Sequence, residues 1–240
     1  MDKYNVYQDM SRRTGGEIYL GIVGPVRTGK STFIKRFMEL VVIPEMADDN
    51  EKVRTIDELP QSADGKTIMT TEPKFIPKEA AVIHFSNQET GKIRLIDCVG
   101  YLVPEAVGAI EEEKERMVKT PWSEEEIPFS KAAEIGTSKV IREHSNLGLI
   151  ITTDGSFGDI PAVNFEEALQ KTVMECEKAG KPFLILVNTS RPDSQETIQF
   201  TKRLEAQYGK TVMAVNCKTM DREDVFRIME QLLADFPITR

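Results

Sequence analysis

Short apolar runs alternate with stretches of helical periodicity along most of the chain. A strand buried on both faces of a parallel sheet is a nearly continuous apolar run, whereas a surface helix has apolar residues every three or four positions. These patterns predict strands at residues 18–23, 81–85, 93–97, 147–152, 183–188 and 211–216. They also predict helices at residues 30–40, 129–145, 164–179, 195–208 and 221–235.

The alternation of strands and helices predicts an α/β fold, with a mostly parallel six-stranded sheet and helices on both of its faces. Residues 86–91, between the second and third strands, are too few for a helical crossover. These two strands should therefore pair as an antiparallel hairpin, which gives the sheet one antiparallel edge strand. Small GTPase-like domains have this arrangement, and we expect one domain over residues 1–240.

Two long segments, residues 44–80 and 98–128, lack sustained periodicity. Loops of this length inside a compact domain are functional or disordered. The second segment contains acidic clusters at residues 111–116 and 123–126, which we expect to face water. Trp122 is the residue expected to anchor this segment to the core.

Composition narrows the classes of partner and compartment. The chain has a formal net charge of −8 at pH 7, so it lacks the positive charge that supports nonspecific nucleic-acid binding. No apolar stretch approaches the roughly 20 residues of a membrane-spanning helix, and the polar N-terminus has no signal-peptide core. Cys98, Cys176 and Cys217 are read as free thiols. We therefore expect a soluble, cytoplasmic protein without direct membrane insertion.

The segment GPVRTGKS, residues 24–31, matches the phosphate-loop motif G-x-x-x-x-G-K-[ST] in full and lies between a predicted strand and a predicted helix. Its glycines allow a tight turn whose N–H groups converge on phosphate oxygens. Lys30 is expected to place a cation near the β- and γ-phosphates, and the Ser31 hydroxyl is expected to bind Mg²⁺. Two roles are equally open for Arg27: its side chain could stabilise charge on the phosphates, or it could point into solvent. The predicted nucleotide-binding residues here are Gly24, Pro25, Val26, Arg27, Thr28, Gly29, Lys30, Ser31 and Thr32.

A second motif follows the third predicted strand, where Asp97 and Gly100 form D-x-x-G. An aspartate at a strand tip beside a phosphate loop is placed to hold Mg²⁺, usually through a water molecule. Gly100 is expected to let its amide approach the γ-phosphate. Alone this motif is weak, because Asp and Gly are common at strand ends, but the preceding phosphate loop makes a metal-binding role for Asp97 the favoured reading.

A third signal is the threonine-rich stretch at residues 65–75, just before the second strand. Nucleotide switches carry a threonine in this position that senses the γ-phosphate and Mg²⁺. Thr67, Thr70 and Thr71 all qualify, and we favour Thr70 and Thr71, with the capping of a turn as the open alternative. The two long irregular segments are then interpreted as nucleotide-sensing switches.

The water-orienting residue of Ras-like enzymes is missing. Tyr101 stands where these enzymes carry a glutamine directly after D-x-x-G. Hydrolysis therefore requires another group, a partner or a neighbouring copy. Thr70 and Thr71 are the candidates within the chain.

The base-reading motif of GTP-binding proteins is also altered. Asn188 closes a predicted strand as the asparagine of Asn-Lys-x-Asp does, but Thr189 and Arg191 stand in place of lysine and aspartate. A site without the aspartate cannot read guanine through its N1–H and exocyclic amine. We therefore expect adenine, or weak selection, with Asn188 and Thr189 at the edge of the base pocket.

Four stretches together resemble the stage IV sporulation protein A family of spore-forming bacteria. They are GGEIYLGIVGPVRTGKSTFIKRFMELVVIP, DELPQSADGKTIMTTEPKF, IRLIDCVGY and ITTDGSFGDI, and the second is specific to the family. The resemblance implies a translation-factor-type GTPase fold that hydrolyses ATP. It also implies that Lys30, Ser31, Thr70, Thr71 and Asp97 serve nucleotide binding, metal binding and hydrolysis, with Ser31, Thr70 and Asp97 at the metal.

The same resemblance implies a role in spore formation. Proteins of the family use ATP hydrolysis to assemble into a static polymer on the forespore surface, inside the mother cell, as the basement layer of the spore coat. Their partners are other coat proteins and a small membrane-bound sporulation peptide. The resemblance links both the polymer contacts and the docking of this peptide to a C-terminal part of the family's proteins, which we expect to have no counterpart in these 240 residues. We expect these 240 residues to represent the nucleotide-binding domain alone.

Other functions stay open at this point. One is a GTPase-like signalling switch that cycles with an activator. Another is a structural module that binds nucleotide with little turnover, which the missing glutamine makes reasonable. A small-molecule phosphotransferase is a further class, but the sequence shows no acceptor site with a catalytic base and a lid.

Overall fold

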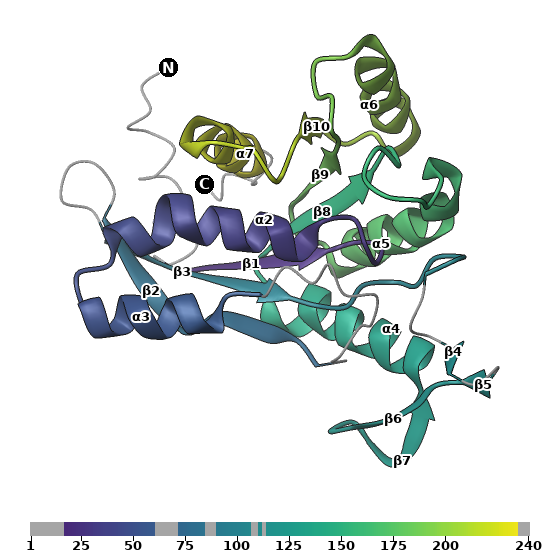
Figure 1. Ribbon diagram of the computed structural model, residues 1–240, viewed down its shortest axis with the longest axis horizontal. Helices are drawn as coiled ribbons and strands as arrows, with labels where there is room; N and C mark the ends of the chain where they lie inside the picture. The colour runs from purple at the N-terminus through teal and green to yellow at the C-terminus, as the bar shows by residue number, and fades with distance from the viewer. Residues whose placement is uncertain (1–16, 61–71, 85–89, 107–109, 112–113, 235–240) are drawn as a thin grey trace.

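A six-stranded sheet forms the centre of the computed structural model, which describes residues 17–60, 72–84, 90–106, 110–111 and 114–234. The order in the sheet is β10-β9-β8-β1-β3-β2 (Figure 1). All neighbouring strands run parallel except β2 and β3, which are antiparallel. The predicted fold class is thereby confirmed. The strands are β1 (Glu17–Val23), β2 (Lys74–His84), β3 (Thr90–Asp97), β8 (Leu147–Thr153), β9 (Phe183–Asn188) and β10 (Val212–Val215).

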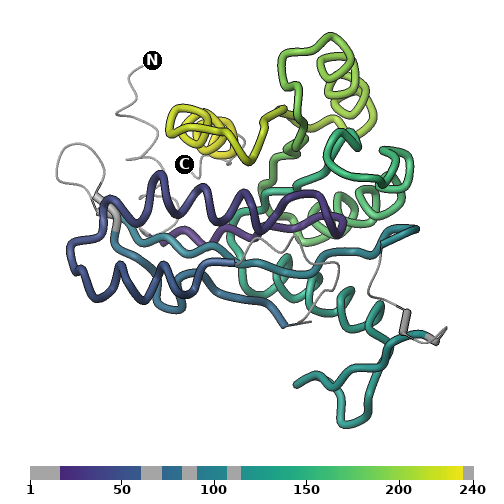
Figure 2. The backbone as a smooth tube through the Cα atoms, in the orientation of Figure 1, coloured from purple at the N-terminus to yellow at the C-terminus, as the bar shows by residue number. Residues whose placement is uncertain are grey.

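Helices cover both faces of the sheet (Figures 1 and 2). One face is covered by α2 (Lys30–Phe37), which continues as a π-helical turn, and by α7 (Arg222–Ala234). The other is covered by α4 (Phe129–Lys139), which also ends in a π-helical turn, α5 (Glu166–Ala179) and α6 (Gln195–Tyr208). Among the described residues, no helix has the length and apolar character that a bilayer crossing requires.

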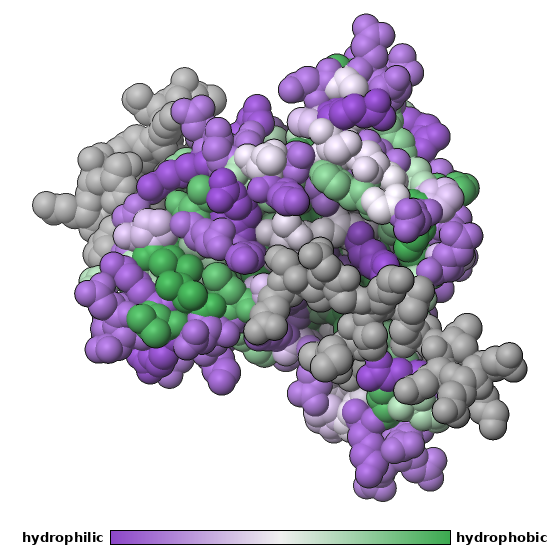
Figure 3. Space-filling view, in the orientation of Figure 1, coloured by the Kyte–Doolittle hydropathy of each residue, from purple (hydrophilic) through white to green (hydrophobic). Residues whose placement is uncertain are grey.

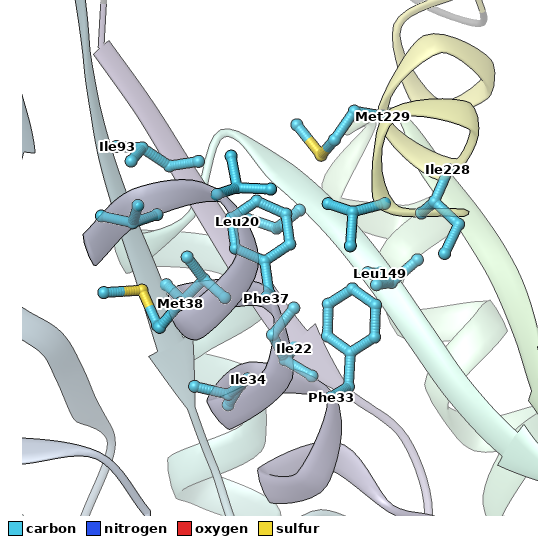
Figure 4. Packing of buried hydrophobic residues seen from close by; sticks show 14 of the residues in the cluster. Leu20, Ile22, Phe33, Ile34, Phe37, Met38, Ile93, Leu149, Ile228 and Met229 are labelled. Atoms are coloured by element: carbon cyan, nitrogen blue, oxygen red, sulfur yellow. The ribbon is translucent and has the colours of Figure 1, made fainter. Parts of the chain in front are cut away.

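Side chains of the central strands alternate between two core clusters. On β8, Leu149 and Ile151 belong to the cluster under α2 and α7, whereas Ile150 belongs to the cluster under α4 and α5. Figure 4 shows the first cluster, in which Phe33 and Phe37 of α2 pack onto the sheet. Because both faces are buried, these strands appear in the sequence as continuous apolar runs, which explains why their positions were predictable.

Residues 44–80 are more regular than predicted. Helix α3 (Asp49–Glu58) lies within them, and β2 begins at Lys74, seven residues before the predicted start at residue 81. The helix has no buried apolar stripe, since Val53 and Ile56 are 59% and 52% exposed. It is specified instead by its N-terminus, where the Asp48 carboxylate accepts hydrogen bonds from the amides at 50 and 51. Figure 3 shows apolar surface on the side of the molecule that carries α2 and α3.

Residues 98–128 also contain unpredicted strands. Two small hairpins pair β4 (Ile110–Glu111) with β5 (Lys114–Glu115) and β6 (Met117–Thr120) with β7 (Ser123–Pro128). Trp122, in the turn of the second hairpin, is half-buried beside Lys139 of α4, whose Nζ lies 6.0 Å from the ring centroid. Trp122 belongs to none of the three core clusters formed by described residues. The hairpin is therefore attached to the outside of α4, and the predicted anchoring in the core is wrong.

The buried face of α2 should contribute most of the stability of this helix. Replacing Ile34→Ala removes a fully buried side chain and should lower the free energy of unfolding by about 2–5 kcal/mol. Ile56→Ala is the matched control, because Ile56 is also helical but is mostly exposed, and its change should stay within about 0.5 kcal/mol. Urea unfolding measures both. Equal losses in the two variants would contradict the described packing.

Candidate functional site

The phosphate loop connects the end of β1 to the start of α2 and is shaped by close backbone contacts. Gly24 and Gly29 have positive φ angles of 129° and 95°. A Cβ atom on Gly24 would lie 2.3 Å from the carbonyl oxygen of Ile151, and one on Gly29 would lie 2.3 Å from the side-chain Nδ2 of Asn188. Only glycine fits either position. The predicted strand–loop–helix context of the motif is confirmed.

Other residues of the loop divide into buried and exposed groups. Pro25, Val26 and Thr28 are buried, and the Thr28 hydroxyl donates to the Pro25 carbonyl at 3.0 Å, which closes the turn. Arg27 is exposed and has a left-handed backbone, with φ 61°. Thr32, on the first turn of α2, is half-buried.

Lys30 is the first residue of α2, and its side chain turns back into the loop. Only 5% of it is exposed, and Nζ donates to the carbonyl oxygens of Pro25 at 2.6 Å and Gly24 at 3.3 Å. Burial lowers the pKa of the ammonium group, and the nearby Cys98 and Asp97 act to raise it. A cation held by two carbonyl dipoles is available to a polyanion that reaches the loop.

Ser31 and Asp97 meet across β1 and β3. Because these strands are parallel and paired, with Ile22 opposite Asp97, the aspartate is brought to the phosphate loop. The Ser31 hydroxyl donates to Asp97 Oδ2 at 3.2 Å, whereas the buried Oδ1 has no hydrogen-bond partner among the described residues. Burial raises the pKa of this carboxyl, although Lys30 and Ser31 act to lower it.

This pair fits a small divalent cation. Hydroxyl and carboxylate oxygens are ligands that Mg²⁺ accepts, together with phosphate oxygens and waters. Asp97 Oδ1 is a buried acceptor that receives no hydrogen bond from the described residues. Ser31 and Asp97 are therefore the described residues that could hold Mg²⁺.

Gly100 brings the D-x-x-G turn directly onto the phosphate loop. Its φ is 92°, and a Cβ atom there would lie 2.0 Å from the Gly24 carbonyl oxygen and 2.7 Å from Lys30 Nζ. The next residue strengthens the contact, since the Val26 amide donates to the Tyr101 carbonyl at 2.9 Å. The two motifs, far apart in sequence, thus form one surface.

Tyr101 and Cys98 flank this turn as packing residues. The Tyr101 side chain is 8% exposed and packs with Val26, Val103 and Phe165. It is therefore a packing residue and does not perform the water-orienting role of the glutamine that Ras-like enzymes carry at this position. Cys98 is buried, and burial raises the pKa of its thiol to about 11. A thiol with this pKa stays protonated near neutral pH, which agrees with the prediction of a free thiol.

Asn188 braces the loop instead of presenting its amide to a ligand. Its Nδ2 donates to the Thr28 carbonyl at 3.1 Å, and its Oδ1 accepts from the Cys217 amide at 3.0 Å. Thr189 is fully buried, and its hydroxyl donates to an Asp154 oxygen at 2.6 Å. Both side chains are committed to the chain itself, while Arg191 is exposed and lies 3.9 Å from Glu196. The predicted place of Asn188 and Thr189 at the edge of a base pocket stays a prediction.

Two supporting features were not foreseen from the sequence. One is the turn after β10, where the Cys217 amide donates to Asn188, the residue that contacts the phosphate loop at Thr28. The other is Asp154, whose carboxylate also accepts from the Ser156 amide at 3.0 Å. Burial acts to raise the pKa of Asp154, but hydrogen bonds from Ser156 and Thr189 hold it below its ordinary value. The sequence signal that could have identified Asp154 is the D-G-S triplet directly after an apolar strand.

Thr67, Thr70 and Thr71 lie outside the described residues, so their predicted roles stay predictions. The His144 ring packs edge-on against Phe75, with 5.3 Å between ring centroids, which makes it a packing residue.

Comparisons with a family model and with individual relatives point to the same family. The sequence profile of the stage IV sporulation protein A ATPase domain matches residues 1–237. Relatives named stage IV sporulation protein A are 50% identical in Bacillus subtilis (strain 168), 49% in Bacillus anthracis and 48% in Clostridioides difficile (strain 630). These alignments cover 99%, 99% and 98% of the chain but 48% of each relative. The chain therefore spans about half the length of these relatives.

Solved structures are more distant. Two variants of a protein named SsGBP match with a TM-score of 0.48 each and with 13% and 14% identity. They cover 94% and 93% of the chain and 58% and 57% of their own chains. A likeness at this level says nothing about the chemistry of the site.

The Asn188 brace should stabilise the folded protein. Asn188→Ala leaves the buried Thr28 carbonyl and the Cys217 amide without partners, so the free energy of unfolding should fall by about 2 kcal/mol or more. Asn50→Ala, at an exposed position on α3, is the control and should change it by less than about 0.5 kcal/mol. Urea unfolding without nucleotide is the measurement. An Asn188→Ala variant with the free energy of unfolding of the wild type would rule out the brace.

The Asp97 carboxylate should instead destabilise the protein when nucleotide and metal are absent. Burial raises its pKa above the ordinary value of 3.8, so the folded state favours the neutral form and loses stability as pH rises through the raised pKa. Asp97→Asn should therefore increase the free energy of unfolding at pH 7 by about 1 kcal/mol or more. The gain should vanish below pH 3.8, where the wild-type carboxyl is also neutral.

Thermal unfolding from pH 3 to pH 8 measures this difference. Asp193→Asn, at an exposed position, serves as the control and should show no gain. An Asp97→Asn variant that is less stable than wild type at pH 7 would contradict the proposed cost of the buried charge.

Proposed function

Because the chain belongs to the stage IV sporulation protein A family, through the ATPase domain that matches nearly all of it, we propose that it binds ATP with Mg²⁺ and hydrolyses it to ADP and phosphate. The reaction is the attack of water on the γ-phosphate, with ADP as the leaving group. The names of the relatives assign this family to sporulation.

One observation carries the proposal, which is the convergence of Lys30, Ser31 and Asp97 at the carboxyl ends of β1 and β3. Ligands of open α/β sheets bind at this edge. Lys30 supplies a cation for the β- and γ-phosphates, and Ser31 and Asp97 supply oxygens for the metal. When bound, Mg²⁺ neutralises charge on the phosphate oxygens.

The proposed base is adenine. Guanine selection requires an acceptor for its N1–H and exocyclic amine, which is normally an aspartate two residues after the lysine of the motif. Arg191 occupies that position and is a donor only. Thr189 is buried against Asp154, so its hydroxyl has a partner within the protein. These features support ATP over GTP.

The group that orients the attacking water is proposed to come from Thr70 or Thr71. Tyr101 is packed into the core cluster around Val26, which removes it as an alternative. The same observation favours a second candidate function, a nucleotide-binding structural module with little turnover. Measurable release of phosphate separates the two.

Hydrolysis is proposed to drive self-assembly. By family resemblance, the product is the basement layer of the spore coat on the forespore surface, in the mother-cell cytoplasm. Other coat proteins and a small membrane-bound sporulation peptide are the proposed partners. These parts concern the whole proteins of the family, of which this chain corresponds to about half.

Lys30→Ala should abolish ATP hydrolysis and weaken ATP binding by at least about tenfold, because the phosphates lose their direct counterion. Lys35→Ala is the matched control, since Lys35 lies on the same helix but has 42% of its side chain exposed, beside Glu39. Phosphate release with ATP and with GTP, and particle size in the same samples, are the measurements.

Wild-type protein should release phosphate faster from ATP than from GTP, and Lys35→Ala should match it. Full ATP affinity in Lys30→Ala would remove the phosphate loop from the proposal. Tight ATP binding with no phosphate release would favour the structural module, and a preference for GTP would favour a signalling switch.

A further inference from the structure

A pocket of about 460 Å³ opens between α4 and α5, and no step of the proposed reaction uses it. Its volume is in the range of about 300–1,000 Å³ that is typical of binding sites. Three lysines line it, Lys131, Lys171 and Lys178, and the buried ring of Tyr101 forms part of its wall. Because Tyr101 follows Gly100 and its carbonyl accepts from Val26, the pocket adjoins the phosphate loop.

The acidic residues of the pocket are already neutralised. Glu175 accepts hydrogen bonds from Arg142 at 2.6 Å and from Ser138 at 2.7 Å, and Glu134 lies 3.8 Å from Lys171. Within the part of the chain that the structure describes, Lys131 and Lys178 form no ion pair. Lys171 also lies 3.5 Å from Glu167, so Lys131 and Lys178 are the two lysines of the lining without an ion pair among the described residues, in a chain whose net charge is −8.

An apolar area accompanies these charges. Ile135 of α4 and Met174 of α5 both line the pocket, and Met174 is 46% exposed. A ligand that combines carboxylates with an apolar side chain would match both features. This combination favours an acidic peptide segment over a free inorganic anion.

The β6–β7 hairpin of the same protein has the complementary composition. Glu124, Glu125 and Glu126 are consecutive and exposed on β7, and none of them pairs with a described cation. Met117, on β6, is 49% exposed. The hairpin lies at the outer edge of the molecule beside α4 (Figure 1). Its turn contacts Lys139, which is not part of the pocket lining, so the glutamates remain accessible to another molecule.

We propose that the pocket between α4 and α5 receives the acidic β6–β7 hairpin of a second copy of the chain. Lys131 and Lys178 would face Glu124 and Glu126, which share one face of β7, and Met117 would meet Met174 and Ile135. Two different surfaces take part, so the contact is head-to-tail and can add further copies. The inference rests on the proposed self-association and names the surfaces that would carry it.

Charge exchange tests the contact. Lys131→Glu/Lys178→Glu changes the pocket, and Glu124→Lys/Glu126→Lys changes the hairpin, while no residue of the nucleotide site is altered. Sedimentation velocity of the 240-residue chain with ATP and Mg²⁺ at low ionic strength should show that each variant self-associates at least about tenfold more weakly than wild type. An equimolar mixture of the two variants should recover association, because each reversed surface then meets its complement.

Lys78→Glu/Lys202→Glu is the control, since it reverses the same number of exposed lysines outside the pocket and should associate like wild type. Unchanged association of both test variants, or a mixture that fails to recover it, overturns the contact. Wild-type chain that stays monomeric also overturns the contact, because both of its surfaces belong to these 240 residues, whereas the proposed self-association concerns the whole proteins of the family. Phosphate release from the same samples tests the proposed ATPase separately, because the variants should retain the wild-type rate.

Discussion

Two opposite charges are held out of water where β1 and β3 end, and the surrounding fold keeps them there. Among the described residues, Lys30 has two loop carbonyls as hydrogen-bond partners, and the Asp97 side chain has the Ser31 hydroxyl. Burial lowers the pKa of Lys30 and raises the pKa of Asp97, so it favours the neutral form of each group. Each buried charge therefore costs folding free energy. A polyphosphate and a divalent cation are the partners that would compensate for both. The site is thus built for a ligand of that chemistry.

The scaffold fixes this arrangement through backbone contacts more than through side-chain chemistry. Gly24, Gly29 and Gly100 permit approaches that any Cβ atom would block. Asn188 then connects the phosphate loop to β9 and to the turn after β10. Helix α2, which carries Lys30 and Ser31, is held on the sheet by its buried apolar face (Figure 4). Direct contacts therefore join the four separate segments that form the site.

The sequence predicted the elements whose burial is regular. The parallel strands and the phosphate loop were found because continuous apolar runs and fixed glycine spacing have direct structural causes. Helix α3 was missed because Val53 and Ile56 face outward, which leaves no apolar stripe. Its start was nevertheless encoded, since Asp48 and Glu51 have the spacing of a capping box.

Within the site, single-residue roles were less predictable than motifs. Asn188 was assigned to the base pocket, but its two hydrogen bonds depend on tertiary contacts with Thr28 and Cys217 that no local pattern contains. The inward packing of Tyr101 likewise depends on Phe165, which is distant in sequence. Sequence identified which residues gather at the site, whereas the structure was needed to separate ligand-facing groups from braces.

The most direct test of this central claim is the titration of wild-type protein with ATP by calorimetry, with and without Mg²⁺, and with GTP for comparison. We expect ATP to bind more tightly when Mg²⁺ is present, because Asp97 Oδ1 then gains a partner. We also expect ATP to bind more tightly than GTP, because Arg191 stands where the guanine-reading aspartate would be. Equal ATP affinity with and without Mg²⁺, together with equal or tighter binding of GTP, would contradict it.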